Sequence, residues 1–413
     1  MAAELIKHPQ KRWHAVYLSV LMISITATLF FILKDNGSAP PWPMDQSFIG
    51  TVDLRIYRLD GHWNFHYPQL QNSGGISSSL LVGLYKLIVP LSPETLNWQV
   101  RSMAMLGYLV SSDVLIRTFI QQPLARISAL LLVATSGFAL IQPSSEILAG
   151  SLFTLFVVAA TRRWPVILAS LLLAGFALCK VEFLLAAPFL ALLWWWRERR
   201  TLKNSWRIPC LVGLWVGLLL APGFAVHGSR VIAGNRSFAA FSVHYASLFL
   251  PHQYQPYSLD PWKSAIAIMN QVFPEAKSIV DVIYRYPKPY LDFLALSAIQ
   301  SISNIAASLK LMLVPMLTTM VNFKTLGGLR FPILLITVAM VCTLIPGWMF
   351  AFVHIRYMAK FYPAIIGLSL AGLQALQSRL QPATLLANLS AILITIIWQT
   401  FNFPMIASHS HFL

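Results

Sequence analysis

Residues 164–200 read WPVILASLLLAGFALCKVEFLLAAPFLALLWWWRERR, and this stretch decides the class of fold. Two apolar runs, at 165–179 and 182–196, meet at the ionisable residues Lys180 and Glu182, and the second run ends in four charged residues. Each run approaches the length of about 20 residues that an α-helix needs to cross a bilayer. The pattern predicts two consecutive membrane spans, with the ionisable pair at one surface and the charged run at the other.

The whole chain has the composition of a polytopic membrane protein. Of its 413 residues, 57% are hydrophobic and 11% are charged, and the mean hydropathy is +0.66. A soluble domain carries about 25% charged residues. The composition excludes a disordered chain, a collagen, a disulfide scaffold and an ordinary cytosolic enzyme. The three cysteines show no metal-ligand spacing, so we expect them to be packing residues.

We predict an all-α polytopic membrane protein with about eleven transmembrane helices, folded as a single domain over residues 1–413. The first apolar core is longer than the roughly 7–15 residues of a signal peptide, which favours a retained anchor. The predicted spans are 14–33, 98–116, 124–142, 146–160, 165–179, 182–196, 209–227, 300–321, 331–353, 357–376 and 383–404.

Charge distribution predicts the orientation of these spans. With the amino terminus inside, the inner segments carry fifteen basic residues and only two acidic ones, Glu4 and Glu198. Basic residues accumulate on cytoplasmic loops, so we expect a cytoplasmic amino terminus and an external carboxyl terminus. The same distribution accounts for the net charge of +16, so we expect the lipid bilayer as a partner and no nucleic acid. Because no endoplasmic-reticulum retrieval signal is seen, we expect the plasma (inner) membrane of a bacterium.

Two predicted outer segments are too long to be simple connectors. The first, 34–97, ends in an apolar stretch at 77–91 that is too short to span upright and is predicted to lie in the membrane interface. The second, 228–299, contains 262–284, which is predicted to be an amphipathic interfacial helix with a break at Pro274. Together they would form a vestibule over the helical bundle, with the second on the acceptor side.

The first outer segment carries two candidate catalytic carboxylates. Asp45 follows a Pro-rich exit from the first span, and a partly desolvated carboxylate there can act as a general base. The alternative is an Asp that caps a loop. Asp53 and Tyr57 are predicted to share one face of a short helix. The alternative is a local ion-pair network of Asp53, Arg55, Arg58 and Asp60.

Histidines and buried charges supply further candidates. His62 and His66 are four residues apart, but the neighbouring Gly61 and Pro68 argue against a helix there, and we predict no metal site. Ionisable groups at membrane depth are expensive and indicate function. By this argument Glu146, Lys180 and Glu182 are site candidates, because Lys180 and Glu182 are too close in sequence to pair along one helix face.

Cations also flank the last predicted outer turn. Arg356 and Lys360, with Tyr357 between them, are four residues apart and would direct two positive charges at the interface. The planar fork of Arg and the point charge of Lys both suit a phosphate group. The alternative is contact with lipid headgroups along the membrane surface.

These pieces resemble, in their order, the motifs of the GT-C superfamily of glycosyltransferases that use polyprenyl-phosphate sugars, particularly its bacterial protein-mannosyltransferase-like branch. The similarity covers most of the chain, although each motif is short. The matching runs are Met44-Asp45-Gln46-Ser47-Phe48, Ile56–Trp63, the Gly/Ser stretch 73–81, Ser145-Glu146, Gly175 through Lys180-Val181-Glu182 to Pro188, and Arg356-Tyr357 leading to Pro363.

The resemblance implies transfer of a sugar from a polyprenyl-phosphate donor to a hydroxyl of an unknown acceptor on the outer face, with inversion. Asp45 would be the general base, with Asp53 as its alternative. Lys180, Arg356 and Lys360 would hold the donor phosphate. Gln46 stands where the family has a second acid, which disfavours a divalent metal, so no cofactor is expected.

Two other functions compete with this interpretation. A transporter or flippase of a lipid-linked saccharide would suit the deeper charges Arg101, Asp113 and Lys310, although the chain has no internal repeat of the kind common in transporters. A non-catalytic assembly subunit is the third possibility.

Overall fold

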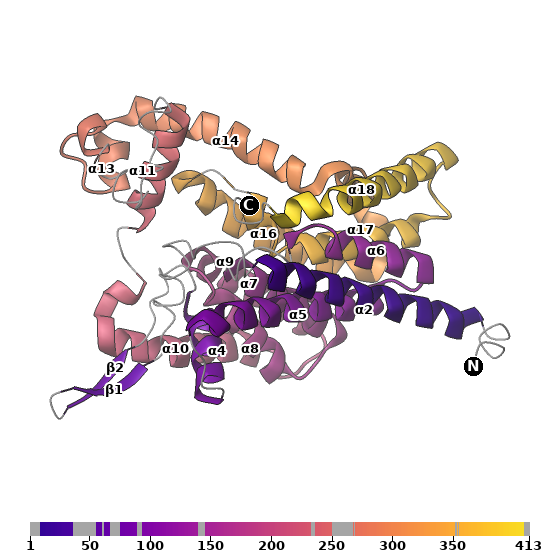
Figure 1. The fold of residues 1–413 in the computed structure, drawn as a ribbon, viewed down its shortest axis with the longest axis horizontal. Helices are drawn as coiled ribbons and strands as arrows, with labels where there is room; N and C mark the ends of the chain where they lie inside the picture. Colours follow the sequence, from indigo (N-terminus) through magenta and orange to yellow (C-terminus); the bar gives the residue numbers. More distant parts are fainter. Residues whose placement is uncertain are drawn as a thin grey trace.

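The computed structural model describes residues 9–35, 55–59, 62–66, 75–88, 93–138, 145–232, 236–249, 267, 269–351, 353 and 355–408. It is a bundle of α-helices with one antiparallel β-hairpin (Figure 1). The elements are α2 (Pro9–Asp35), β1 (Arg55–Leu59), β2 (His62–His66), α4 (Gly75–Ile88), α5 (Pro93–Phe119), α6 (Pro123–Ala134), α7 (Ser145–Arg162), α8 (Val166–Ala177), α9 (Val181–Glu198), α10 (Arg207–His227), η2 (Gly228–Val231), α11 (Arg236–Phe249), α13 (Ile279–Arg285), α14 (Pro287–Leu309), η4 (Lys310–Met312), α15 (Leu313–Val321), η5 (Phe323–Thr325), η6 (Gly327–Leu329), α16 (Arg330–Phe350), η7 (Ile355–Met358), α17 (Tyr362–Leu376) and α18 (Pro382–Ser408).

The class of fold is confirmed as a helical membrane protein. A helix lies in each of the predicted spans, and five helical segments of the described chain are long and apolar enough to cross a bilayer. The shorter apolar helices are α6, α8 and α17. The five long segments are Trp13–Phe31, Arg207–His227, Pro287–Val321, Gly327–Phe350 and Pro382–Asn402.

Helix α17 can be short because protein surrounds it. Nearly all of its side chains are buried. A Cβ atom at Gly367 would overlap the side chain of Leu115 on α5, and one at Gly372 would overlap Thr319 on α15. These two glycines let three helices approach closely, as small residues do at helix contacts in membranes.

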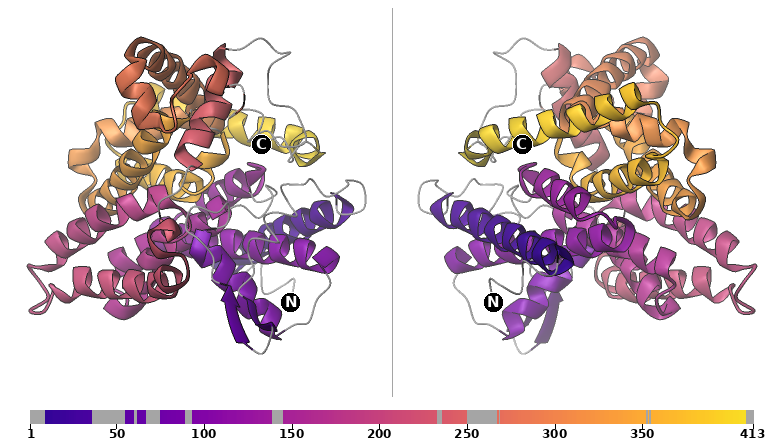
Figure 2. Two further views of the ribbon diagram at one scale, coloured as in Figure 1. Left: turned by 90° about the vertical axis from the view of Figure 1, so that its left-hand side faces the viewer. Right: turned by 90° about the vertical axis from the view of Figure 1, so that its right-hand side faces the viewer.

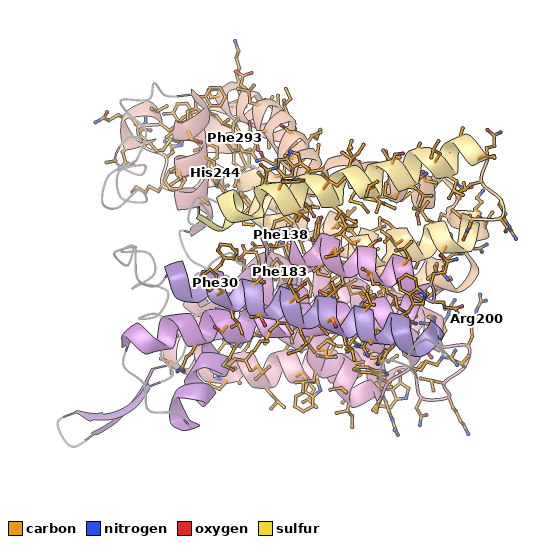
Figure 3. The ribbon with its side chains drawn as sticks, turned by 45° about the vertical axis from the view of Figure 1, so that its right-hand side comes forward. Phe30, Phe138, Phe183, Arg200, His244 and Phe293 are labelled. Atoms are coloured by element: carbon orange, nitrogen blue, oxygen red, sulfur yellow. The ribbon has the colours of Figure 1, made fainter. Side chains whose placement is uncertain are left out.

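The two long predicted outer segments contribute elements to the same end of the bundle. The hairpin and α4 from the first segment, and α11 and α13 from the second, lie away from the amino terminus (Figure 1). The left view of Figure 2 looks at the bundle from this end. Helices α11, α13 and α14 share an aromatic core that includes Phe241 and Phe293. In Figure 3, Arg200 lies at the opposite end from Phe293 and His244.

The first of these segments differs from the prediction in its secondary structure. The short helix expected around Asp53 and Tyr57 is wrong for Tyr57, which lies in strand β1 opposite Asn64. Hydrophobic and polar residues alternate in β2, and the pair Leu59↔His62 encloses the sequence Asp60-Gly61. A two-residue Asp-Gly connection between alternating strands is a strong hairpin signal, and it outweighs the four-residue spacing.

The second segment is also more helical than predicted. The span expected at 300–321 is wrong in its start, because α14 already begins at Pro287, a residue well suited to the first turn of a helix. The helix is interrupted at Lys310, whose φ is 51°. Helix α11 was not predicted, whereas the expected break at Pro274 lies in a turn between helical residues and α13.

Helix α13 has a capped start. The Ser278 hydroxyl accepts a hydrogen bond from the backbone N–H of Asp281 (3.2 Å) and donates one to the Asp281 carboxylate (2.9 Å). The backbone N–H of Lys277 also donates to this carboxylate (3.0 Å). These hydrogen bonds lower the pKa of Asp281. The cap therefore satisfies N–H groups that the helix itself leaves free.

Asp113 joins helices α2 and α5. Its carboxylate accepts hydrogen bonds from the Tyr17 hydroxyl (2.5 Å) and from Nε of Arg117 (2.8 Å). The Arg117 guanidinium also lies over the Tyr17 ring, 5.1 Å from its centroid. Asp113 is thus a paired structural charge in this bundle.

We predict that Asp113→Ala lowers stability by about 1–3 kcal/mol, because it leaves the buried Tyr17 hydroxyl without its acceptor. Thermal unfolding of the detergent-purified protein measures the effect. Tyr17→Phe removes only one hydrogen bond and should cost less, about 1 kcal/mol. Strictly additive effects in the double variant would show that the two side chains are not coupled.

Candidate functional site

Two predicted site residues form a buried ion pair. Lys180 precedes α9, and its ammonium contacts the Glu146 carboxylate in the first turn of α7. The Lys180 side chain is 10% exposed and that of Glu146 is 2% exposed. Residues 34 positions apart are therefore brought together where little water reaches them.

The ring of Tyr357 joins this pair to a second lysine. Its centroid lies 5.0 Å from Nζ of Lys180 and 5.4 Å from Nζ of Lys360. Cations are attracted to aromatic faces at such distances. Glu146, Lys180, Tyr357 and Lys360, which we call the two-lysine cluster, come from three separate segments of the chain.

Lys360 is the least compensated charge in this cluster. It is 2% exposed, and its Nζ lies 4.3 Å from the ring centroid of Phe183 and 5.3 Å from that of Phe361. In the described part of the chain, no hydrogen bond or ion pair reaches its ammonium, although the charges of Glu182 and Glu146 act on it from further away. A buried ammonium held only by aromatic faces is costly, so an anion would be a favourable partner.

Backbone contacts fix the position of Lys360. The Tyr108 hydroxyl on α5 donates a hydrogen bond to the carbonyl of Ala359 (2.8 Å). A Cβ atom at Gly150 on α7 would lie 3.0 Å from Cα of Lys360 and 3.0 Å from the Tyr108 ring. The absence of a side chain at Gly150 lets α7 approach the turn that carries Lys360.

The end of the first outer segment is attached beside the cluster. The first backbone N–H groups of α4, those of Ile76 and Ser77, donate to the Leu178 carbonyl (2.9 and 3.1 Å). The Ser77 hydroxyl donates to the carbonyl of Gly175 (2.7 Å). Helix α4 therefore begins against Leu178, which precedes Lys180 by two residues in the sequence.

Gly75 permits this attachment. Its φ is 61°, and a Cβ atom there would overlap the carbonyl of Cys179. A left-handed backbone conformation at this point favours glycine. The Gly/Ser stretch singled out in the sequence therefore has a structural reason at Gly75.

The remaining predicted residues are not assembled by the described part of the chain. Asp45 and Asp53 lie outside the described residues. The backbones of Arg58, His62 and Arg356 lie in β1, β2 and η7, but their side chains fall outside the described part. Glu182 is half-buried in the first turn of α9. Among the residues described, no three His, Cys, Asp or Glu side chains could hold a metal ion.

Sequence reasoning missed the aromatic surroundings and the supports of Lys360. Phe183 and Phe361 each adjoin a predicted charge, and that adjacency was the available signal. Tyr108 and Gly150 gave none, because their roles depend on the packing of α5 against α7. Comparison with known proteins gives no match from any protein-family model or from the curated proteins.

We predict that Gly75→Ala destabilises the protein by about 2 kcal/mol or more, because it combines backbone strain with a collision against Cys179. Thermal unfolding in detergent measures the change. Gly213→Ala is the matched control, since nothing lies within 4 Å of its added Cβ. In a helix that substitution should be neutral or stabilise by up to about 1 kcal/mol. Equal stability of both variants would contradict the proposed contact.

Proposed function

We propose that this chain is a membrane glycosyltransferase of the GT-C type. It transfers a sugar from a polyprenyl-phosphate-linked donor to an acceptor hydroxyl of a glycan, lipid or protein on the outer face of a bacterial plasma membrane. The reaction inverts the anomeric centre, and Asp45 is the general base. In this proposal the chain crosses the membrane about eleven times, with its amino terminus in the cytoplasm.

The observation that supports the proposal best is the two-lysine cluster. A lipid phosphate leaving a sugar needs its negative charge stabilised, and it needs no proton to depart. Lys180 and Lys360 face one aromatic ring, and Lys360 lacks an ion-pair partner within the described chain. Buried cations interact strongly with an anion, since the local dielectric constant is low.

The location of the cluster also supports this function. It lies where α4, the end of the first long segment, is hydrogen-bonded to the turn between α8 and α9. The segment that contains Asp45 is therefore joined at its end to the neighbourhood of the phosphate site. A base and a leaving-group site on the two sides of one sugar are what an inverting transfer requires.

Transport of a lipid-linked saccharide is the second candidate. Lys310 favours it, since this residue interrupts the long apolar segment Pro287–Val321 and its Nζ lies 3.9 Å from the ring centroid of Trp398. Asp113 favours it less, because Tyr17 and Arg117 pair with its carboxylate. The same assay distinguishes transfer from transport.

The first test is sugar release from a panel of radiolabelled polyprenyl-phosphate sugars by the protein in lipid. We expect turnover of one donor, reduced about 10²–10⁴-fold in Asp45→Asn because general base catalysis is lost. Asp292→Asn, which alters an exposed acid on α14, is the control and should retain activity. Movement of labelled lipid across the bilayer without turnover, equal in both variants, would replace the transferase with a transporter. An Asp45→Asn variant altered only in abundance would favour an assembly subunit.

We further predict that Lys360→Met weakens donor binding about tenfold or more, because a charged hydrogen bond to the phosphate is lost. The same substitution should leave thermal stability unchanged or raise it, since it replaces a buried ammonium by an apolar side chain of similar length. Donor binding and unfolding temperature are measured on one preparation. Loss of stability together with unchanged binding would show that Lys360 is structural.

A further inference from the structure

We propose that Glu146 determines which phosphate the site retains. By neutralising Lys180, it leaves the two-lysine cluster suited to one negative charge. The site then binds the phosphodiester of a lipid-linked sugar in preference to the phosphate monoester that remains after transfer. This inference rests on the proposed function and adds a specificity residue to it.

The ion pair is the first support. The contact between Glu146 and Lys180 is buried on both sides, so water screens it little. The charge of Glu146 also acts on Cys179 and on Lys360. A second negative charge brought into this space would meet the carboxylate as well as the lysines, and like charges repel strongly at low dielectric constant.

The second support is Lys360, the lysine of the cluster that has no ion-pair partner among the described residues. Lys360 is buried against Phe183, Tyr357 and Phe361. Because Tyr357 faces both lysines, a phosphate on Lys360 would also lie within the influence of the Lys180–Glu146 pair. Glu182 is more exposed than Glu146, so water screens its charge more effectively.

The chemistry of transfer changes the charge of the lipid. The acceptor oxygen forms a bond to the anomeric carbon while its proton passes to Asp45. The bond between that carbon and the phosphate oxygen breaks, and its electron pair stays on the phosphate. A phosphodiester carries one negative charge, and the monoester produced carries nearly two at neutral pH and above, since its second pKa is about 6. The singly charged donor would thus stay bound through the lysines, whereas Glu146 would repel the doubly charged lipid product and favour its release.

The test measures the dissociation constants of the full chain in lipid nanodiscs at pH 8. The probes are a polyprenyl-phosphate sugar and the polyprenyl phosphate of the same chain length. The wild type should prefer the diester by about tenfold or more, and Glu146→Gln should remove or reverse that preference. Glu275→Gln is the matched control, because Glu275 pairs with Arg285 at an exposed position, and it should keep the wild-type ratio.

A double variant guards against a folding defect. Glu146→Gln alone leaves a buried ammonium without its carboxylate, whereas Glu146→Gln with Lys180→Gln removes both charges. The double variant should bind both lipids more weakly than Glu146→Gln does. It should also prefer the diester again, as the wild type does. An unchanged ratio in folded Glu146→Gln would overturn this inference while leaving the transferase intact. Failure of the folded wild type to bind either lipid would overturn the proposed function and this inference with it.

Discussion

Hydrocarbon offers no hydrogen bonds, and this constraint shapes every described part of the bundle. Backbone N–H and C=O groups in a bilayer must bond within the chain, which an α-helix achieves by itself. Where a helix ends, another element supplies the missing partner. The carbonyl of Leu178 beyond α8 accepts two N–H groups from the start of α4, and that exchange attaches α4 to the turn that carries Lys180.

Charged side chains in the bundle also need partners within the chain, and several of the described ones have them. Asp113 accepts hydrogen bonds from Tyr17 and Arg117. Glu198, which is nearly fully buried, lies 3.4 Å from Nε of Arg163 and 3.6 Å from Nε of Arg197. Lys360 differs from these groups, since its ammonium lies against aromatic faces and has no ion-pair partner in the described chain. Among the described residues, the other buried charges have ion-pair partners and Lys360 has none, and departures of this kind concentrate at functional sites.

Apolar run length predicted the helices well because it measures the property that a bilayer selects. The predictions gave the wrong secondary structure or helix start where turn sequence or proline determines the local conformation. Tyr57 lies in a strand because an Asp-Gly connection and the alternation in the partner strand β2 determine local structure there. Helix α14 begins at Pro287 because proline starts a helix even in a polar segment. Charges at membrane depth indicated Glu146 and Lys180, and the four-residue spacing from Arg356 indicated Lys360; in the structure Glu146 pairs with Lys180, and Tyr357 faces both lysines. Their mutual contacts, and the roles of Tyr108 and Gly150, depend on how α5 and α7 pack, which no local pattern encodes.

The supports around Lys360 explain how such a cation can be retained. An unpaired buried ammonium favours any rearrangement that brings it to water, so the fold must hold it in place. The hydrogen bond from Tyr108 fixes the carbonyl of Ala359, and Gly150 lets α7 press against Cα of Lys360. In the proposed transferase, rigid backbone support would mean that little reorganisation is needed when the donor phosphate binds, and preorganised charge stabilises a leaving group effectively. The same rigidity would increase the selectivity that we propose for Glu146. A carboxylate fixed beside the site cannot move away from a second negative charge, so it repels that charge more strongly.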